Sequence, residues 1–364
     1  MTAIAFARPA VDRSTQPVAL ERRRDPWYDN AKMLLVTLVV VGHTWTLLPE
    51  NRLNTWLYDF LYLWHVPAFV MVTGYLSRSF TWSRRSIGRL MTGVALPYLV
   101  FEAALLSFRV HVGGEDLDLV FADPHWPMWY LAVLFLWRLA TPVLRAVPRA
   151  LAWAVAVCLL GGLSTGDVLD TARALGLLPF FVVGLLARPE HLDLLRRPRA
   201  RVLAGAAMAT ALGLASLIDG RMATEWLYWR SSYGELDATV VEGMLLRLGL
   251  LAVCGVLAVA FFALVPRRPG WFSRLGTATL VVYLFHGFAV RGVGYTRFPE
   301  WAAAHPFLSL ALASPLAVVL AVGLAWPAVA RRLSVLVDPV GAYRRRRRRR
   351  PRAPLRSSPL HQGT

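Results

Sequence analysis

The sequence is poor in cysteine, in lysine and in acidic residues. Its two cysteines, Cys158 and Cys254, both lie within long apolar stretches, so they predict neither a disulfide framework nor a metal site. The sequence also contains no glycine-rich loop followed by lysine, of the kind that holds nucleotide phosphates, and no zinc-ligand spacing. These absences argue against an ATP-driven pump and against a metal-dependent hydrolase.

Lys32 is the only lysine among the 40 Lys and Arg residues of the chain. It lies eleven residues before His43, within the first long apolar stretch. Eleven helical steps of about 100° return to within about 20° of the starting direction, so both side chains are expected on one helix face, about 16 Å apart along the axis. An ionisable pair inside a membrane-spanning helix is energetically unfavourable and indicates a functional site.

Long apolar stretches dominate the chain, in which 56% of the residues are hydrophobic and 17% are charged. Many of these stretches are long enough to cross about 30 Å of hydrocarbon. The sequence therefore predicts an all-α, polytopic membrane protein with about ten transmembrane helices. Counts of nine and eleven stay open, because the fifth and sixth stretches are short and could be partly re-entrant. The expected spans are residues 31–48, 56–77, 87–108, 128–146, 150–165, 172–187, 201–218, 243–265, 276–293 and 307–330.

Most arginines of the connecting segments fall on one side of a ten-span arrangement, while the opposite connections are acidic or mixed. The positive-inside rule then places both termini in the cytoplasm and the protein in the cell membrane. The predicted organisation is a disordered cytoplasmic segment over residues 1–26, a transmembrane domain over 27–332, and a disordered arginine-rich tail over 333–364. A run of arginines from Arg344 to Arg350 in this tail indicates contact with anionic lipid rather than with nucleic acid.

Three histidines are predicted to lie at similar depth in the membrane. His43 belongs to the first expected span, His65 to the second and His286 to the ninth, and each falls close to the bilayer centre at 1.5 Å per residue. This agreement predicts a shared polar chamber. The alternative is that each histidine makes one interhelical hydrogen bond that only stabilises the bundle. That alternative is weakest for His43, which shares a helix face with Lys32.

Further polar and aromatic candidates lie in or beside the expected spans. Glu102 and Arg247 are expected to pair with each other or to line a cavity. Arg173 begins the sixth span on the outer side, where it would contact substrate or lipid headgroups. Trp129 belongs to an aromatic group that begins at Trp126, and anchoring at the membrane interface is the alternative for this group.

Six short motifs follow one another along the chain. The first consists of Lys32, ten intervening residues and His43. The others begin at His65 (HVPAFVMVTGYLS), Leu96 (LPYLVF), Trp129 (WYLAVLF), Arg173 (RALGLLPFF) and Tyr283 (YLFHG). In this order they resemble membrane acyltransferase family 3, most closely its fucose 4-O-acetylase-like branch, and the resemblance covers about residues 25–330.

The resemblance implies transfer of an acyl group, usually acetyl, from cytoplasmic acetyl-CoA to a hydroxyl of a carbohydrate or similar acceptor. It implies acyl-CoA as a co-substrate, with no bound cofactor and no metal. An alcohol is a poor nucleophile until a base removes its proton, and a neutral histidine such as His43 suits that work. Lys32, His65 and His286 are the further catalytic candidates, and membrane lipids are the expected surroundings.

Arginines on the cytoplasmic side are suited to hold the phosphates of such a donor. Arg85 and Arg89 are the donor-binding candidates, although the Arg-x-x-Arg motif of related O-acetyltransferases is one residue longer here. Their alternative role is to orient the third span through the positive-inside rule. Trp129, Arg173 and Glu102 are the candidates for binding the acceptor.

Two other classes of function stay open at this point. A transporter or flippase for a polar lipid or sugar could also be built around polar groups in the membrane, but no internal repeat and no pair of interrupted spans in corresponding halves is evident in the sequence. A passive membrane scaffold would leave the pairing of Lys32 with His43 unexplained.

Overall fold

The computed structural model describes residues 25–117, 121–163, 168–218 and 222–341. Within these ranges the chain forms helices and connecting segments and contains no β-strand. The predicted all-α fold of a membrane protein is therefore confirmed. The predicted terminal segments lie mostly outside the described residues, but helix α17 (Pro327–Val337) continues into the range expected to be a disordered tail.

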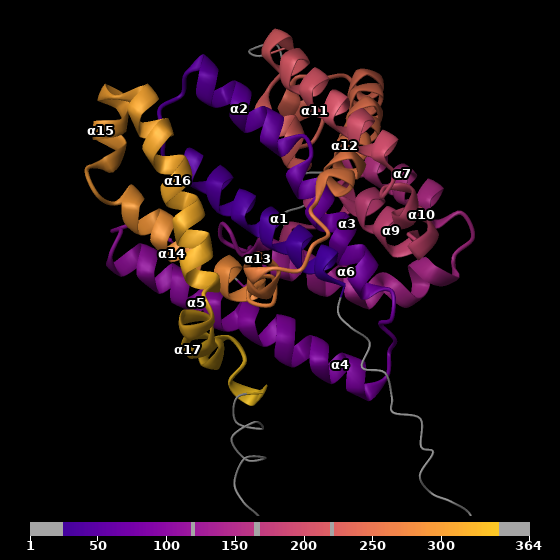
Figure 1. Cartoon of the computed structure of the whole chain (residues 1–364), viewed down its shortest axis with the longest axis horizontal. Coiled ribbons are helices and arrows are strands. Elements are labelled where there is room, and N and C mark those ends of the chain that lie inside the picture. Colours follow the sequence, from indigo (N-terminus) through magenta and orange to yellow (C-terminus); the bar gives the residue numbers. More distant parts are fainter. Residues whose placement is uncertain (1–24, 118–120, 164–167, 219–221, 342–364) are drawn as a thin grey trace, which may run out of the picture.

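The α-helices pack around α1, which lies in the middle of the molecule between α16 and α3 (Figure 1). In chain order, the helices of the described residues are α1 (Pro26–Trp45), α2 (Arg52–Tyr62), α3 (His65–Ser77), α4 (Arg84–Leu90), α5 (Leu96–His111), α6 (Trp129–Ala146), α7 (Ala150–Gly161), α8 (Thr171–Gly176), α9 (Leu178–Leu186), α10 (Pro189–Leu194), α11 (Pro198–Ile218), α12 (Val240–Leu264), α13 (Trp271–Leu275), α14 (Thr279–Gly294), α15 (Phe298–Ala304), α16 (Pro306–Ala325) and α17.

Four helical segments of the described chain are long and apolar enough to cross a membrane, and a fifth is added if one bent pair of helices counts as a single span. The prediction of ten spans is therefore not confirmed, although each of the ten predicted stretches contains a helix. Helices α7 and α14 are apolar but short, whereas α1 and α6 have 20 and 18 residues and contain polar side chains that lower their hydropathy. The segments that qualify are Arg52–Ser77, Arg84–His111, Val240–Leu264 and Pro306–Ala325, and the bent pair is Val168–Gly176 with Leu178–Leu186.

Prolines explain two irregular points along the helices. The π-helical turn Met91–Ala95 lies just before Pro97, which cannot donate the backbone hydrogen bond that a regular α-helix needs at this point. Pro179 lies in the first turn of α9, after the 62° bend between α8 and α9. This bend agrees with the possibility that the sixth stretch is re-entrant. The break between α2 and α3 at Trp64 places His65 at the first position of α3.

Helices α3 and α9 pack backbone against backbone through two glycines. A Cβ atom added to Gly74 would lie 2.0 Å from the carbonyl oxygen of Phe181, and one added to Gly184 would lie 1.9 Å from that of Met71. Small residues allow this close approach, which membrane helices use widely. Because α1 packs against α3, α14 and α16, the helices that carry His43, His65 and His286 are fixed relative to one another.

Candidate active site

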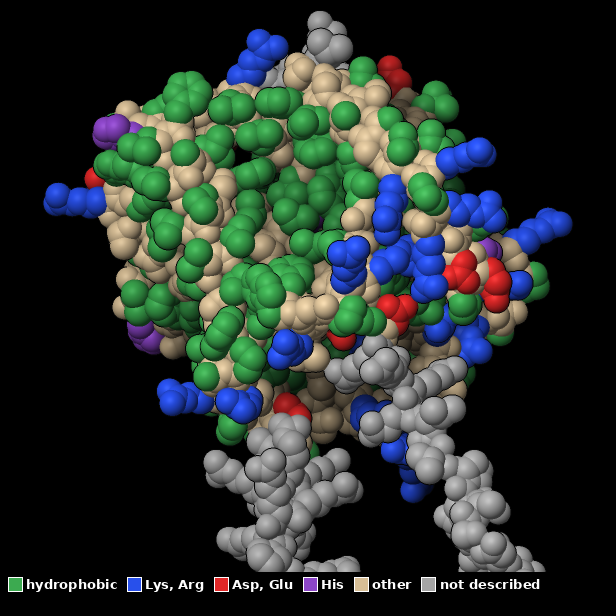
Figure 2. Space-filling model, in the orientation of Figure 1, with side chains coloured by type: hydrophobic (Ala, Val, Ile, Leu, Met, Phe, Trp, Pro, Cys, Tyr) green, Lys and Arg blue, Asp and Glu red, His purple; other side chains and the backbone are tan. Residues whose placement is uncertain are grey.

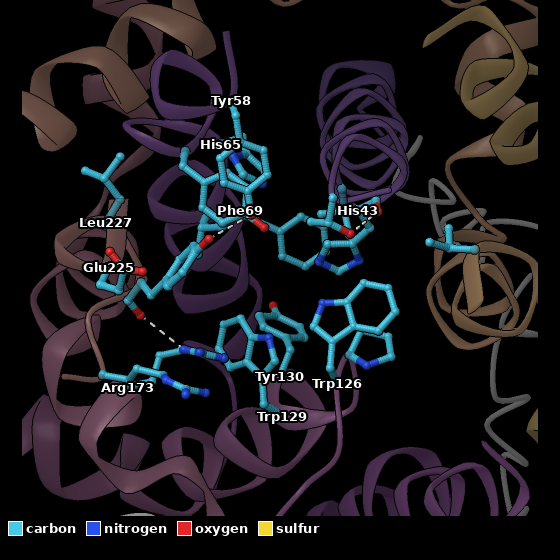
Figure 3. Close-up of a pocket in the computed structure, with 18 of the residues that line it drawn as sticks. His43, Tyr58, His65, Phe69, Trp126, Trp129, Tyr130, Arg173, Glu225 and Leu227 are labelled. Atoms are coloured by element: carbon cyan, nitrogen blue, oxygen red, sulfur yellow. Dashed lines mark hydrogen bonds between the residues drawn. The ribbon is translucent and has the colours of Figure 1, made fainter. Parts of the chain in front are cut away.

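A cavity of about 540 Å³ lies between α1, α2, α3, α8, α14 and the start of α6 (Figure 3). His43 and His65 both line it, together with Arg173, Arg230, Arg291 and one carboxylate, Glu225. Half of the other lining residues are aromatic. The aromatic lining residues are Tyr58, Tyr62, Phe69, Trp126, Trp129, Tyr130, Tyr228 and Tyr283.

His43 and His286 are joined by a hydrogen bond behind the wall of this cavity. Nδ1 of His43, in the last turn of α1, lies 2.8 Å from Nε2 of His286, which is fully buried in α14. Nδ1 of His286 in turn lies 2.6 Å from the carbonyl oxygen of Tyr283 and 3.2 Å from that of Val282. The two imidazole rings are nearly parallel, with their centroids 5.0 Å apart.

These contacts fix the tautomers of both neutral histidines. A carbonyl oxygen only accepts hydrogen bonds, so Nδ1 of His286 carries the proton and its Nε2 is an acceptor. Nδ1 of His43 must therefore donate to His286, which leaves the lone pair of His43 on Nε2. Nε2 of His43 is thus free to accept a proton, and His286 holds His43 in this tautomer.

Trp126 covers one face of His43. The ring centroids of Trp126 and His43 are 4.5 Å apart, and the guanidinium of Arg291 lies 4.8 Å from the Trp126 ring on the cavity wall. Trp126 lines the cavity, so its indole ring can present the Nε1–H to a molecule bound there. Figure 3 shows the Trp126 ring directly beside His43. A donor for a developing negative charge is thus available next to the base.

His65 lies in the same cavity but has a different partner. Its Nδ1 donates to the carbonyl oxygen of Leu61 over 2.8 Å, and its ring meets Tyr62 edge-on at 4.6 Å between centroids. The structure therefore brings all three predicted histidines to one place, and pairs only His43 with His286. His65 contributes to the wall of the cavity.

Arg173 and Trp129, both predicted to bind the acceptor, lie in contact on the cavity wall. The guanidinium carbon of Arg173 is 4.3 Å from the Trp129 ring centroid. Its Nε donates to the carbonyl oxygen of Tyr228 over 3.1 Å, and its Nη1 lies 2.9 Å from Asp170. These contacts hold the guanidinium of Arg173 and the ring of Trp129 on the wall of the same cavity.

Glu115 holds Arg291 from outside the cavity. Nε of Arg109 lies 3.1 Å from both oxygens of Glu115, and Tyr295 also donates to this carboxylate. The Arg109 contact, followed by that of Tyr295, lowers the pKa of Glu115 to about 2. Arg291 approaches Glu115 to 4.0 Å. Its guanidinium is thereby held between this carboxylate and the Trp126 ring.

Residues 25–328 match the family model described as Acyltransferase domain (Acyl_transf_3). The chain belongs to this acyltransferase family. The family resemblance inferred from the six motifs is therefore confirmed, while the narrower branch stays a prediction. Nodulation protein NolL of Sinorhizobium fredii (strain NBRC 101917 / NGR234) is 28% identical over 146 residues, and the aligned region covers 36% of this chain and 40% of that protein. No solved structure matches the chain.

Lys32 lies in the second turn of α1, away from the cavity of the acyltransferase domain. Its Nζ pairs with Asp29 at 2.8 Å, and Lys32 is not among the residues that line the cavity. Arg85 and Arg89 are exposed on α4 and do not line the cavity either, and Nε of Arg89 approaches the carbonyl oxygen of Arg85 at 3.4 Å. The structure therefore separates these three residues from His43, and their roles stay predictions.

The expected pairing of Glu102 with Arg247 is wrong. Glu102 is fully buried and accepts hydrogen bonds from the backbone N–H of His125 at 2.9 Å and from its Nδ1 at 2.5 Å. Arg247 instead donates to the carbonyl oxygens of Cys158 and Ser231. Glu102 does not line the cavity. It ties the segment just before Trp126 to α5, so it supports the cavity wall from behind.

Trp126 and Arg291 line the cavity but were not among the site residues expected from the sequence. Trp126 was expected to anchor the protein at the membrane interface, because a tryptophan near the end of a span is typical of such anchors. Arg291 lies in the last turn of α14, the helix that carries His286. The sequence does contain a signal for Arg291, because it is a charged residue on the apolar helix that also carries the candidate His286.

Proposed function

We propose that this protein transfers an acyl group, in the simplest case acetyl, from a cytoplasmic acyl-CoA to a hydroxyl of a carbohydrate-type acceptor bound in the cavity beside His43. Membership of the acyltransferase family supports the reaction class. The hydrogen bond between His43 and His286 on the cavity wall is the observation that carries the proposal. In this arrangement both termini lie in the cytoplasm and the cavity belongs to the opposite half of the membrane.

His43 acts as the general base in the proposed reaction. Its Nε2 takes the proton of the acceptor hydroxyl while the oxygen attacks the thioester carbonyl carbon. The imidazolium that forms keeps its Nδ1–H bonded to Nε2 of His286, and the backbone carbonyl of Tyr283 holds His286 in place. When the tetrahedral intermediate collapses, the carbon–sulfur bond breaks, and the thiolate of CoA leaves with the proton from His43.

Trp126 and Arg291 stabilise the negative charge on the carbonyl oxygen. The indole ring of Trp126, which carries an N–H donor, lies with its centroid 4.5 Å from that of the His43 ring. The guanidinium of Arg291 lies against the same ring. A fixed donor and a fixed positive charge in a site with little water lower the barrier because they need no reorganisation as the charge develops.

The acceptor binds on the aromatic part of the wall. Sugar rings present C–H faces that pack on aromatic side chains, and Trp129 with Arg173 offers both such a surface and hydrogen-bond donors. The donor approaches from the cytoplasmic side, where Arg85 and Arg89 contact its phosphates. Transfer then requires the acyl end of the donor to reach His43.

The proposal is tested with the purified full-length protein, acetyl-CoA labelled in the acetyl group and a mixture of carbohydrate acceptors. Thiol release and label in the acceptor are both expected, and His43→Gln should remove both while leaving the melting temperature unchanged. Label that stays on the protein when no acceptor is present would show that the acetyl group passes through a covalent acyl-enzyme. Sugar movement across proteoliposomes without thioester cleavage would instead identify a transporter and overturn the proposal.

A further inference from the structure

A second cavity lies at the other end of α1, beside its first turn. It has a volume of about 360 Å³ and is lined almost entirely by apolar side chains of α1, α3, α7, α9, α10 and α12. Trp27, Tyr75 and Val183 are among them. It shares no lining residue with the cavity beside His43. Its occupant therefore need not take part in the reaction.

The outer edge of this second cavity consists of exposed aliphatic side chains. Leu151, Leu186 and Val259 are 39%, 46% and 40% exposed. Val259 belongs to α12, a helix long and apolar enough to cross the membrane, so this edge faces lipid. An occupant that enters here comes from the bilayer. An alkyl chain suits the lining, whereas a water-soluble nucleotide would find almost no polar partner.

Positive charge borders the cavity on another side. The guanidinium of Arg267 lies 5.5 Å from the ring of Trp27, and Arg196 directly follows Leu195, which lines the cavity. Figure 2 shows that basic side chains gather over the region of α9 and the connection from α12 to α13, with acidic side chains at the edge. This surface is suited to an anionic group.

The nearby carboxylates pair with Arg196 and leave Arg267 without an ion-pair partner among the described residues. Asp25 and Asp193 both pair with Arg196, at 3.6 and 3.1 Å. Arg267 keeps Nε and Nη2 without an acceptor in the part of the chain that the structure describes, and Arg201 adds a further positive charge beside it. Unpaired donors of this kind call for an acceptor that the protein itself does not supply.

We propose that this cavity binds an anionic phospholipid of the cytoplasmic leaflet, with one acyl chain in the apolar interior and the phosphate beside Arg267. The positive-inside orientation places this end of α1 on the cytoplasmic side. Basic pockets between membrane helices on that side bind anionic headgroups. The lipid braces the start of α1 against α12 and α10, and α1 carries His43 at its other end.

The test is native mass spectrometry of the full-length protein in a neutral detergent, titrated with palmitoyl-oleoyl phosphatidylglycerol or with the matching phosphatidylcholine. The wild type should bind phosphatidylglycerol more tightly than phosphatidylcholine. Arg267→Gln and Arg196→Gln should each weaken that binding about fivefold, the effect of one basic residue on an anionic lipid. Arg267→Lys should keep most of the affinity for phosphatidylglycerol. Val183→Phe, which fills the cavity, should weaken the binding of both lipids.

Arg331→Gln is the matched control, because Arg331 is an exposed arginine of α17, on the same predicted side, that does not line the second cavity. It should bind phosphatidylglycerol as the wild type does. The proposal is overturned if both Arg267→Gln and Val183→Phe also bind like the wild type. It is equally overturned if Arg267→Gln weakens binding of acetyl-CoA and leaves phosphatidylglycerol unaffected, since the site would then belong to the acyl donor. Neither lipid result depends on catalytic activity.

Discussion

Nδ1 of His43 lies 2.8 Å from Nε2 of His286, although 243 residues separate them in the chain. The backbone carbonyl of Tyr283 holds the proton on the far side of the His286 ring, so only one arrangement of protons satisfies both this carbonyl and the contact between the two rings. This arrangement leaves Nε2 of His43 as the one free base. In the proposed reaction, His286 would do for His43 what a buried carboxylate does for the histidine of a catalytic triad.

Replacing His286 by Leu should lower kcat by roughly 10²–10⁴-fold, the usual contribution of a correctly placed base. The KM values for donor and acceptor should change little, because His286 does not line the cavity. His286→Gln should recover part of the activity, since its amide oxygen can accept from Nδ1 of His43. Steady-state kinetics of the purified variants make the comparison.

His65→Leu is the control for this prediction, because His65 is another buried histidine of the same cavity whose Nδ1 bonds to a backbone carbonyl. It should affect kcat less than His286→Leu. If His286→Leu retained more than a tenth of the wild-type kcat, the positioning role would be refuted.

Trp126→Phe should lower kcat by about 10²-fold, as the loss of one oxyanion donor does in other acyl-transfer enzymes. Phenylalanine keeps a ring against His43 but has no N–H, so the change isolates the hydrogen bond from the packing. Trp129→Phe makes the same chemical change on the neighbouring turn and should act mainly on the acceptor KM, because Trp129 contacts Arg173. Equal effects of both substitutions on kcat would contradict the assignment.

The helices could be predicted from the sequence because their apolar stretches are long and visible locally. The bend before Leu178 could be expected in part, because the sixth stretch is short and contains Pro179, whereas nothing in the sequence marks the interruption at Trp64. The sequence predicted that His43 and His286 lie at a similar depth in the membrane. It could not predict the hydrogen bond between them, because that contact depends on how α1 packs against α14. Glu102 was correctly expected to be buried, but its partner His125 lies in a connecting segment with no periodic pattern.

Lys32 should contribute through the donor rather than through His43. Because it pairs with Asp29 near the start of α1, its loss should leave the geometry of the cavity intact. Lys32→Met is expected to raise the KM for acetyl-CoA several-fold with kcat close to wild type, and Lys32→Arg to keep partial function because it preserves the charge. A full loss of kcat in Lys32→Met, at unchanged melting temperature, would place Lys32 in the chemical step instead.

Arg85→Gln and Arg89→Gln should each raise the apparent KM for acetyl-CoA by roughly tenfold, because one charge-assisted contact to phosphate contributes about 1.5–3 kcal/mol. The acceptor KM should stay constant. Both arginines are exposed, so neither change should lower the melting temperature. If the arginines only orient the helix, less of each variant protein would be inserted into the membrane. The inserted fraction would keep the wild-type KM for acetyl-CoA.

Glu115 should make the stability of the protein depend on pH in the acidic range. Arg109 and Tyr295 lower the pKa of Glu115 from its ordinary value of 4.5 to about 2, so the folded state favours the ionised carboxylate. The resulting stabilisation is fully present above pH 4.5 and is lost as the pH falls toward 2. Glu115→Gln lacks it at every pH. The melting temperature of the wild type should therefore exceed that of Glu115→Gln at neutral pH, and the difference should shrink as the pH falls from 4.5 to 2.

Glu300→Gln, at an exposed glutamate in the first turn of α15, is the control and should show no such convergence. Because Glu115 also holds Arg291 against Trp126, Glu115→Gln should lower kcat at neutral pH as well, by less than Trp126→Phe does. A difference in melting temperature that stays constant from pH 7 to pH 3 would show that Glu115 does not bind its partners as a carboxylate. A normal kcat in the same variant would show that Arg291 keeps its position without Glu115.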